Sequence, residues 1–335
     1  MDKLLVQELR GELVECEYEG HICGVSYSGE IKYRFGDPRH VTYMRSAAKP
    51  IQAIPAFRHG IEERYPFNDK ELTIMTASHR AEPFHVQALE AMLDKVGIGE
   101  DELVCGSTYP LNAAARHGLV AQGKPERRLY HNCSGKHLGL LSYCRSKGYP
   151  TEGYADPGHP AQREVLETLA LLAEYPADRI EIGIDGCGFP VFGLPLLHMA
   201  KAYLKFACPE LIEDEPTRRA VERIGNLMNA NAEMVSGTGL ICSTLLKDDN
   251  IVAKGGAKGI YCFGLRKERL AFALKVMDGS EDKWPIIVAS ILEQIGYDNQ
   301  RTIDSLYELC PRQFANGSGT IVGTNKAVFR LETVG

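Results

Sequence analysis

A serine and a lysine stand three positions apart in segment 44–50, MRSAAKP. Ser46 is a favoured residue type for a helix N-cap, alanines promote helix, and a proline is tolerated in a first turn. Because positions three apart share a helix face, we expect Lys49 beside Ser46. A hydroxyl becomes nucleophilic when a neighbouring base takes its proton, and a lysine with a lowered pKa is such a base. The alternative is an ordinary capped helix with a solvated lysine.

Two more segments carry residues of the same chemistry. Ser78 stands where a predicted helix ends, and Lys254 lies on a predicted strand before glycines that let a ligand approach the backbone. Taken alone, the lysine segment also fits a tight hairpin with solvated lysines. The chain order Ser-x-x-Lys, serine, Lys-x-Gly resembles that of penicillin-recognising hydrolases and serine glutaminases.

Two cysteines lie in polar, glycine-flanked loops, Cys133 in NCSGKH and Cys187 in DGCG. A cysteine with titratable neighbours differs from a structural cysteine buried in an apolar run. Two thiolates with nitrogen donors suit zinc, and His137 is the conventional third ligand. Free thiols are the alternative, because the two cysteines are far apart in sequence.

The composition is that of an ordinary globular protein. The chain has 335 residues, 44% of them hydrophobic and 24% charged, with a net charge of −6. Without a basic field or an apolar run of spanning length, we expect no nucleic-acid or membrane partner, and we favour a small-molecule substrate. The N-terminal segment carries acids and has no apolar core, so a cytoplasmic location is expected. The ten cysteines are interpreted as reduced thiols, some of them possible ligands.

Strand-type patterns occur at both ends of the chain and helical patterns between them. Turn signals at Glu19-Gly20 and Ser28-Gly29 divide residues 4–35 into three predicted strands. Asn68 to Glu71 forms a capping box that opens a helix, and Pro83 starts another that ends at Gly97. Further helices are predicted at 46–57, 112–122, 136–147, 160–175, 196–206, 216–231 and 284–295, and further strands at 180–184, 250–253, 259–264, 269–276 and within 320–331.

This order predicts an α+β fold. Both chain ends contribute to one antiparallel sheet with flanking helices, beside a helical region. We predict a single domain over 1–335, with an α/β part at about 1–60 and 237–335 and a helical part at about 61–236.

Taken together, the motifs resemble the rhizobial-type (class 3) L-asparaginases over nearly the whole chain. The matching segments, in chain order, are RSAAKP at 45–50, ASH at 77–79, NCSGKH at 132–137, DGC at 185–187, EMVSG at 233–237, KGGA at 254–257 and KVMDG at 275–279.

The resemblance implies a homodimeric serine-lysine amidohydrolase, similar in fold to serine β-lactamases and glutaminases, that hydrolyses L-asparagine to L-aspartate and ammonia through an acyl-enzyme. It implies Ser46 as nucleophile with Lys49 as its base, and Ser78 with Lys254 as a second pair. It also implies zinc held by Cys133, Lys136 and Cys187, with a structural or substrate-positioning role. Arg45, Asn132, His137 and Asp185 are the expected substrate-binding residues.

The chain departs from the family pattern at Lys258, where an acid commonly stands, and Gly255 lacks the hydroxyl found after the lysine in penicillin-recognising relatives. The missing hydroxyl counts against β-lactam turnover. Three alternatives stay open: a glutaminase, a β-lactam or peptide amidase on the same scaffold, and a non-catalytic zinc-stabilised amino-acid-binding protein.

Overall fold

The computed structural model describes residues 3–334. The chain forms two compact units, one made of residues 1–43, 194–208 and 239–335 and the other of residues 44–193 and 209–238. We call them the sheet unit and the helical unit. The single domain expected from the sequence, with a helical part at about 61–236, stays a prediction. In the structure, helix α8 (Leu196–Ala207) belongs to the sheet unit.

One antiparallel sheet organises the sheet unit. Its main path runs β10-β11-β1-β2-β9-β8-β7, and β3 pairs with both β2 and β12. The strands are β1 (Leu4–Arg10), β2 (Leu13–Val25), β3 (Ile31–Phe35), β7 (Ile251–Gly256), β8 (Ile260–Leu265), β9 (Leu270–Val276), β10 (Gln313–Ala315), β11 (Ile321–Ala327) and β12 (Glu332–Thr333); β4 (Val41–Tyr43) ends the first segment of this unit.

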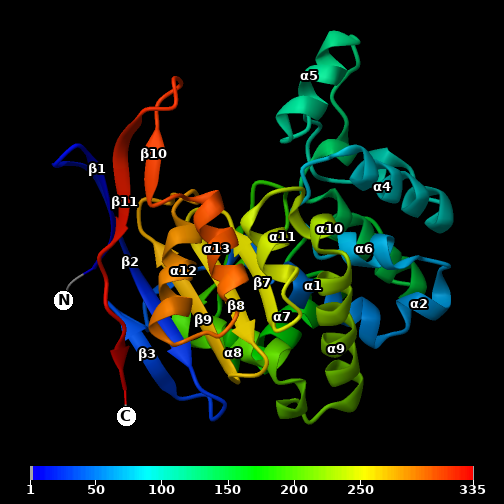
Figure 1. The fold of residues 1–335 in the computed structure, drawn as a ribbon. Helices are drawn as coiled ribbons and strands as arrows, with labels where there is room; N and C mark the ends of the chain where they lie inside the picture. Colours follow the sequence, from blue (N-terminus) through cyan, green and yellow to red (C-terminus); the bar gives the residue numbers. More distant parts are fainter. Residues whose placement is uncertain (1–2, 335) are drawn as a thin grey trace. The chain divides into compact units, whose positions relative to one another are not determined.

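The two ends of the chain meet in this sheet. β1 pairs antiparallel with β11, from Val6 opposite Ala327 to Arg10 opposite Gly323, and Figure 1 shows the blue and red strands side by side. β2 joins the N-terminal strands to β9, with Gly20 opposite Val276. The predicted α+β class, with an antiparallel sheet from both chain ends, is confirmed.

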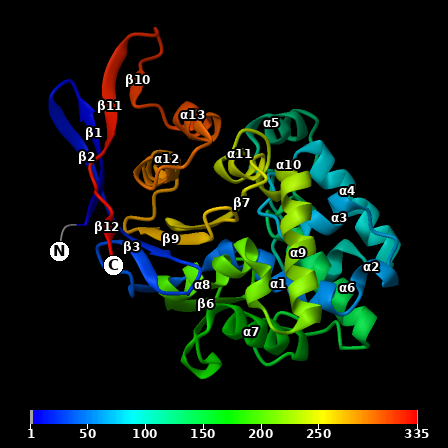
Figure 2. The same ribbon diagram turned by 60° about the horizontal axis from the view of Figure 1, so that its bottom comes forward.

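Helices cover both faces of the sheet centre. α8 packs against β2, β8 and β9, while Figure 2 shows α12 (Trp284–Gln294) and α13 (Gln300–Leu309) on the opposite side of β9. α11 (Ile241–Leu246) packs on β7. Covered on two faces, β8 and β9 are buried along their whole length, which explains their nearly continuous apolar sequences.

The helical unit is built around α1 (Lys49–Arg58), which contacts α6 (Ser134–Lys147), α7 (Pro160–Ala173) and α9 (Glu215–Ala230). Its other helices are α2 (Ile61–Arg64), α3 (Asp69–Ile74), α4 (Pro83–Val96), α5 (Ala113–Ala121) and α10 (Ala232–Ser236). β5 (Glu181–Ile184) pairs antiparallel with β6 (Pro190–Pro195), so that the loop between them carries Cys187.

The capping box predicted at Asn68 is confirmed. The Asn68 side chain accepts a hydrogen bond from the Glu71 N–H, and the Glu71 carboxylate accepts one from the Asn68 N–H. Glu71 is 2% exposed and is also paired with Lys95, whose Nζ lies 2.7 Å from Oε2. The box fixes the start of α3, and four residues after that helix ends the chain reaches Ser78.

The predicted turn at Gly20 is wrong, because β2 continues through it. A Cβ at this position would lie 2.1 Å from the Lys275 carbonyl oxygen, so the glycine permits close approach to β9. The chain turns earlier, at Gly11, where φ is +58°. Helix α13 and strand β6 had no prediction.

Among residues 3–334, no helix is long and apolar enough to cross a membrane.

We expect Glu71→Ala to lower the free energy of unfolding by about 2 kcal/mol, because the variant loses a helix cap and a buried partner of Lys95. Urea denaturation measures the change. Lys70→Ala, at an exposed position of the same helix, is the matched control and should stay within about 0.5 kcal/mol of the parent protein. Equal stability of the two variants would contradict the assignment.

Candidate active site

Ser46 lies in a short 3-10 turn, Arg45–Ala48, that leads directly into α1. The N-cap predicted at Ser46 is wrong, since Met44 caps the turn and Ala48 caps α1. The Lys49 N–H instead donates to the Ser46 carbonyl oxygen. Arg45 has a φ of +51°, in the left-handed region that a non-glycine residue rarely adopts. The residue before the predicted nucleophile is therefore held in a strained conformation, as is common at functional sites.

The Lys49 side chain is buried, and three oxygen atoms surround its amine. Nζ lies 2.6 Å from the Ala77 carbonyl oxygen, 3.1 Å from the Asn132 carbonyl oxygen and 3.0 Å from the Ser78 hydroxyl. Three chain segments thus meet at one nitrogen. The structure brings Lys49 and Ser78 into direct hydrogen-bonding contact.

Burial lowers the pKa of Lys49, although the nearby Cys133 sulfur opposes this shift. A neutral amine has two N–H groups and one lone pair. The two carbonyl oxygens can only accept, so they take both N–H groups of that form. The lone pair is then left for the Ser78 hydroxyl, which can donate its proton to it. This geometry is suited to proton transfer between the lysine and a serine.

The Ser46 hydroxyl makes no hydrogen bond to the Lys49 amine in the part of the chain that the structure describes. It is half-buried, one 3-10 turn before Lys49. Side chains three apart eclipse one another in such a turn, so the two remain neighbours along the chain. The roles predicted for Ser46 and Lys49 stay predictions.

Cys133, Lys136 and Cys187 form a second buried cluster in the same unit. The Lys136 Nζ lies 3.2 Å from the Cys187 Sγ, and the two cysteine side chains hydrogen-bond each other. Cys133 comes just before α6 and Lys136 lies in its first turn, while Cys187 lies in the loop between β5 and β6. The structure thus brings the three predicted zinc ligands together.

Electrostatic coupling links this cluster to Lys49. The hydrogen bond from Cys187 and the charges of Lys49 and Lys136 lower the pKa of the Cys133 thiol. Burial opposes a charge on Lys136, but the two sulfurs outweigh it and raise its pKa. One thiolate and one ammonium therefore stabilise each other inside the protein.

The donor set of this cluster fits a zinc ion. Two sulfurs and one nitrogen are the ligand types that zinc prefers, and three protein ligands leave one position open. Within residues 3–334, no group of three or more histidine, cysteine, aspartate or glutamate side chains could hold a metal ion. Lysine is therefore needed to complete the set, and a metal would have to displace its proton.

His137 is buried beside this cluster, and Tyr154 fixes its orientation. The Tyr154 hydroxyl accepts a hydrogen bond from the Val104 N–H and lies 2.7 Å from the His137 Nδ1. The direction of this hydrogen bond depends on the tautomer of the ring. The His137 Nε2 is buried and has no hydrogen-bond partner in the described chain. Burial lowers the pKa of His137. Nδ1 is thus occupied by Tyr154, and Nε2 is the ring atom left for a further partner.

Two predicted substrate-binding residues are paired with each other. The Arg45 Nη2 lies 2.8 Å from the Asp185 Oδ1. The Arg45 Nε is buried without a hydrogen-bond partner in residues 3–334. Asn132 contributes its carbonyl oxygen to Lys49 and its side chain to the Cys133 thiol. The four predicted binding residues therefore lie on segments that carry the lysine and sulfur clusters.

Sequence reasoning missed several residues that position this site. The His131 Nδ1 accepts the Cys133 N–H, and the Lys136 Nζ lies 4.3 Å from the centre of the Phe189 ring. His79 bonds Ser134 across 2.9 Å and thereby ties the Ser78 segment to the start of α6. His79 and His131 could have been noticed, because each stands one or two residues from a predicted site residue. No sequence signal pointed to Tyr154.

Lys254 belongs to the sheet unit, where it lies on β7 and donates to the Gly255 carbonyl oxygen at 2.7 Å. Its predicted pairing with Ser78 stays a prediction.

Two solved structures resemble this chain at low sequence identity. A β-lactamase from Mycobacterium bovis is 17% identical, with 82% of this chain and 94% of that chain covered and a TM-score of 0.40. A protein from Bacteroides dorei assigned as a β-lactamase is 11% identical, with 83% and 93% covered and a TM-score of 0.44. No sequence among the curated proteins matches this chain.

The profile of the L-asparaginase II family matches residues 6–327, which is nearly the whole chain and includes every residue of both clusters. The family resemblance predicted from the motifs is thereby confirmed, and it indicates an amidohydrolase of the asparaginase type. This chain belongs to the L-asparaginase II family.

Proposed function

We propose that this protein hydrolyses the side-chain amide of L-asparagine to L-aspartate and ammonia through a serine acyl-enzyme. The observation that carries the proposal is the buried Lys49 amine, held by two carbonyl oxygens and hydrogen-bonded to Ser78, in a chain of the L-asparaginase II family. Such an amine can act as a base because burial favours its neutral form.

In the first step the Ser46 hydroxyl replaces that of Ser78 at the Lys49 lone pair. Lys49 then takes the Ser46 proton, and the Ser46 oxygen attacks the amide carbon. Backbone N–H groups, with that of Ser46 as our candidate, stabilise the tetrahedral oxyanion. The carbon–nitrogen bond then breaks and the leaving nitrogen must gain a proton. We assign this proton transfer to Ser78, and its hydrogen bond to the Lys49 amine supports the assignment. Water afterwards attacks the ester by the reverse path and releases aspartate.

Arg45 and Asp185 are the proposed anchors for the amino-acid part of the substrate. The unpartnered Arg45 Nε is a donor suited to the α-carboxylate, and the Asp185 carboxylate is an acceptor suited to the α-ammonium group. Asn132 and His137 complete the proposed set. The His137 Nε2 is a further buried polar atom without a hydrogen-bond partner in the described chain.

Zinc is the proposed metal, and Cys133, Lys136 and Cys187 are its proposed ligands. When bound it would supply a positive charge that keeps the sulfurs deprotonated and holds the β5–β6 loop against α6. Its proposed role is structural or substrate-positioning, because Ser46 already fills the place of the nucleophile. A homodimer and a cytoplasmic location remain proposals that rest on the resemblance and the composition.

Ser46→Ala should reduce ammonia release from L-asparagine by on the order of 10⁴-fold or more, because no acyl-enzyme can form. Mass spectrometry of the quenched parent enzyme should find the acyl group on the peptide that contains Ser46. Ser305→Ala, at a half-buried position of α13 outside both clusters, is the matched control and should keep full activity. An acyl group on Ser78 would instead make Ser78 the nucleophile. A parallel assay with L-glutamine tests the glutaminase alternative.

Cys133→Ser should remove most of the bound zinc, measured by metal analysis of the purified protein, because a hydroxyl is a far weaker zinc ligand than a thiolate. Cys144→Ser, at a buried cysteine of α6 outside the cluster, is the control and should retain zinc. The KM for L-asparagine is measured on both variants to detect substrate positioning. Unchanged zinc content in Cys133→Ser would refute the ligand assignment.

A further inference from the structure

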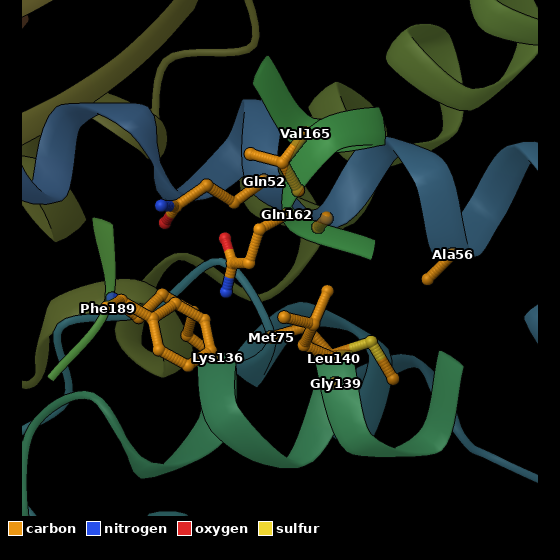
Figure 3. Close-up of a pocket in the computed structure, with 10 residues that line it drawn as sticks. Gln52, Ala56, Met75, Lys136, Gly139, Leu140, Gln162, Val165 and Phe189 are labelled. Atoms are coloured by element: carbon orange, nitrogen blue, oxygen red, sulfur yellow. The ribbon is translucent and has the colours of Figure 1, made fainter. Parts of the chain in front are cut away.

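A small chamber lies between α1, α6 and α7 of the helical unit (Figure 3). It has a volume of about 10 Å³. Most of its wall is apolar and includes Met75, Leu140, Val165 and Phe189. A space of this size holds one water molecule and no larger ligand.

Two carbonyl oxygens in this chamber have no hydrogen-bond partner. They are the Oε1 atoms of Gln52 and Gln162, and both are buried and unpaired in the described chain. Gln52 is 7% exposed and Gln162 is 2% exposed. Figure 3 shows the two side chains reaching from α1 and α7, with their amide groups turned toward the same side. An unpaired buried carbonyl group is costly, so two in one chamber point to a ligand that donates hydrogen bonds.

The acceptor role of Gln162 is fixed by its other contact. Its Nε2 donates to the Tyr154 carbonyl oxygen at 3.0 Å. Rotating the amide by 180° would place an oxygen against that carbonyl oxygen, so Oε1 must face the chamber. The chamber therefore offers hydrogen-bond acceptors to its ligand.

The ligand chemistry that fits is neutral. Two oxygens are too few to replace the hydration shell of an alkali cation, and Lys136 is among the residues that line the same chamber. A water molecule has two donors, one for each oxygen. We propose that the chamber binds a single water molecule that bridges Gln52 Oε1 and Gln162 Oε1.

This water would connect the Lys49 site to the surroundings of the Cys133–Lys136–Cys187 cluster, through helices α1 and α7. Gln52 lies three residues after Lys49 on α1 and so shares its helix face. Gln162 lies on α7 and holds the Tyr154 backbone, while the Tyr154 hydroxyl holds His137. The water thus joins the helix that carries Lys49 to the segment that orients His137.

A high-resolution crystal structure of the full chain tests the proposal directly. We expect one density peak within about 3.2 Å of both Oε1 atoms. An empty chamber would overturn the proposal, as would a rearrangement in which the Gln52 amide donates directly to Gln162 Oε1. Crystals soaked in rubidium or ammonium salts distinguish a cation, because an anomalous rubidium signal, or a peak that depends on ammonium, would also overturn it.

Thermal stability gives a second test whose sign depends on the water. Gln52→Met keeps the side-chain size but removes the oxygen. If a water pairs with this oxygen, the variant removes one of the two acceptors of that water, and Tm falls by about 2 °C. If the oxygen is unpaired, its removal raises Tm, and the proposal is overturned. Gln87→Met, at an exposed position of α4, is the matched control and should leave Tm unchanged.

Discussion

The structure of the candidate site depends on one buried amine. Lys49 Nζ bonds the carbonyl oxygens of Ala77 and Asn132 and the hydroxyl of Ser78, and these atoms belong to segments far apart in sequence. A buried ammonium or amine without partners would destabilise the fold, so the three segments must meet at this nitrogen. The requirement that positions Lys49 thereby also positions Ser78 and the start of the Cys133 loop.

The two buried lysines differ in their preferred charge, and their neighbours explain why. Burial dominates at Lys49 and lowers its pKa, whereas the Cys133 and Cys187 sulfurs dominate at Lys136 and raise its pKa. A single thiolate next to both amines stabilises only one positive charge well. The two lysines therefore differ in charge although their side chains are chemically identical. Lys49 is an amine suited to act as a base, and Lys136 is a cation paired with the sulfurs.

Much of this fold could be predicted from local sequence patterns. The Asn68 capping box, the helix from Pro83 to Gly97 and the buried strands near the C-terminus follow from residue types and spacing. The role of Gly20 could not be predicted, because this glycine permits a close approach to β9 and no local pattern reveals that contact. In the candidate site, residue type and surrounding sequence predicted Ser46, Lys49 and the two cysteines as functional residues. The contact of Lys49 with Ser78 depends on tertiary packing, and the segment around Ser46 did not predict it.

The choice between Lys136 and His137 as third partner of the sulfurs illustrates the same limit. Spacing favours histidine, the conventional ligand. In the structure, however, the His137 Nδ1 lies 2.7 Å from the Tyr154 hydroxyl. The Lys136 Nζ lies 3.2 Å from the Cys187 Sγ. Tertiary packing, which spacing does not reveal, therefore gives the lysine the direct contact with a sulfur of the pair.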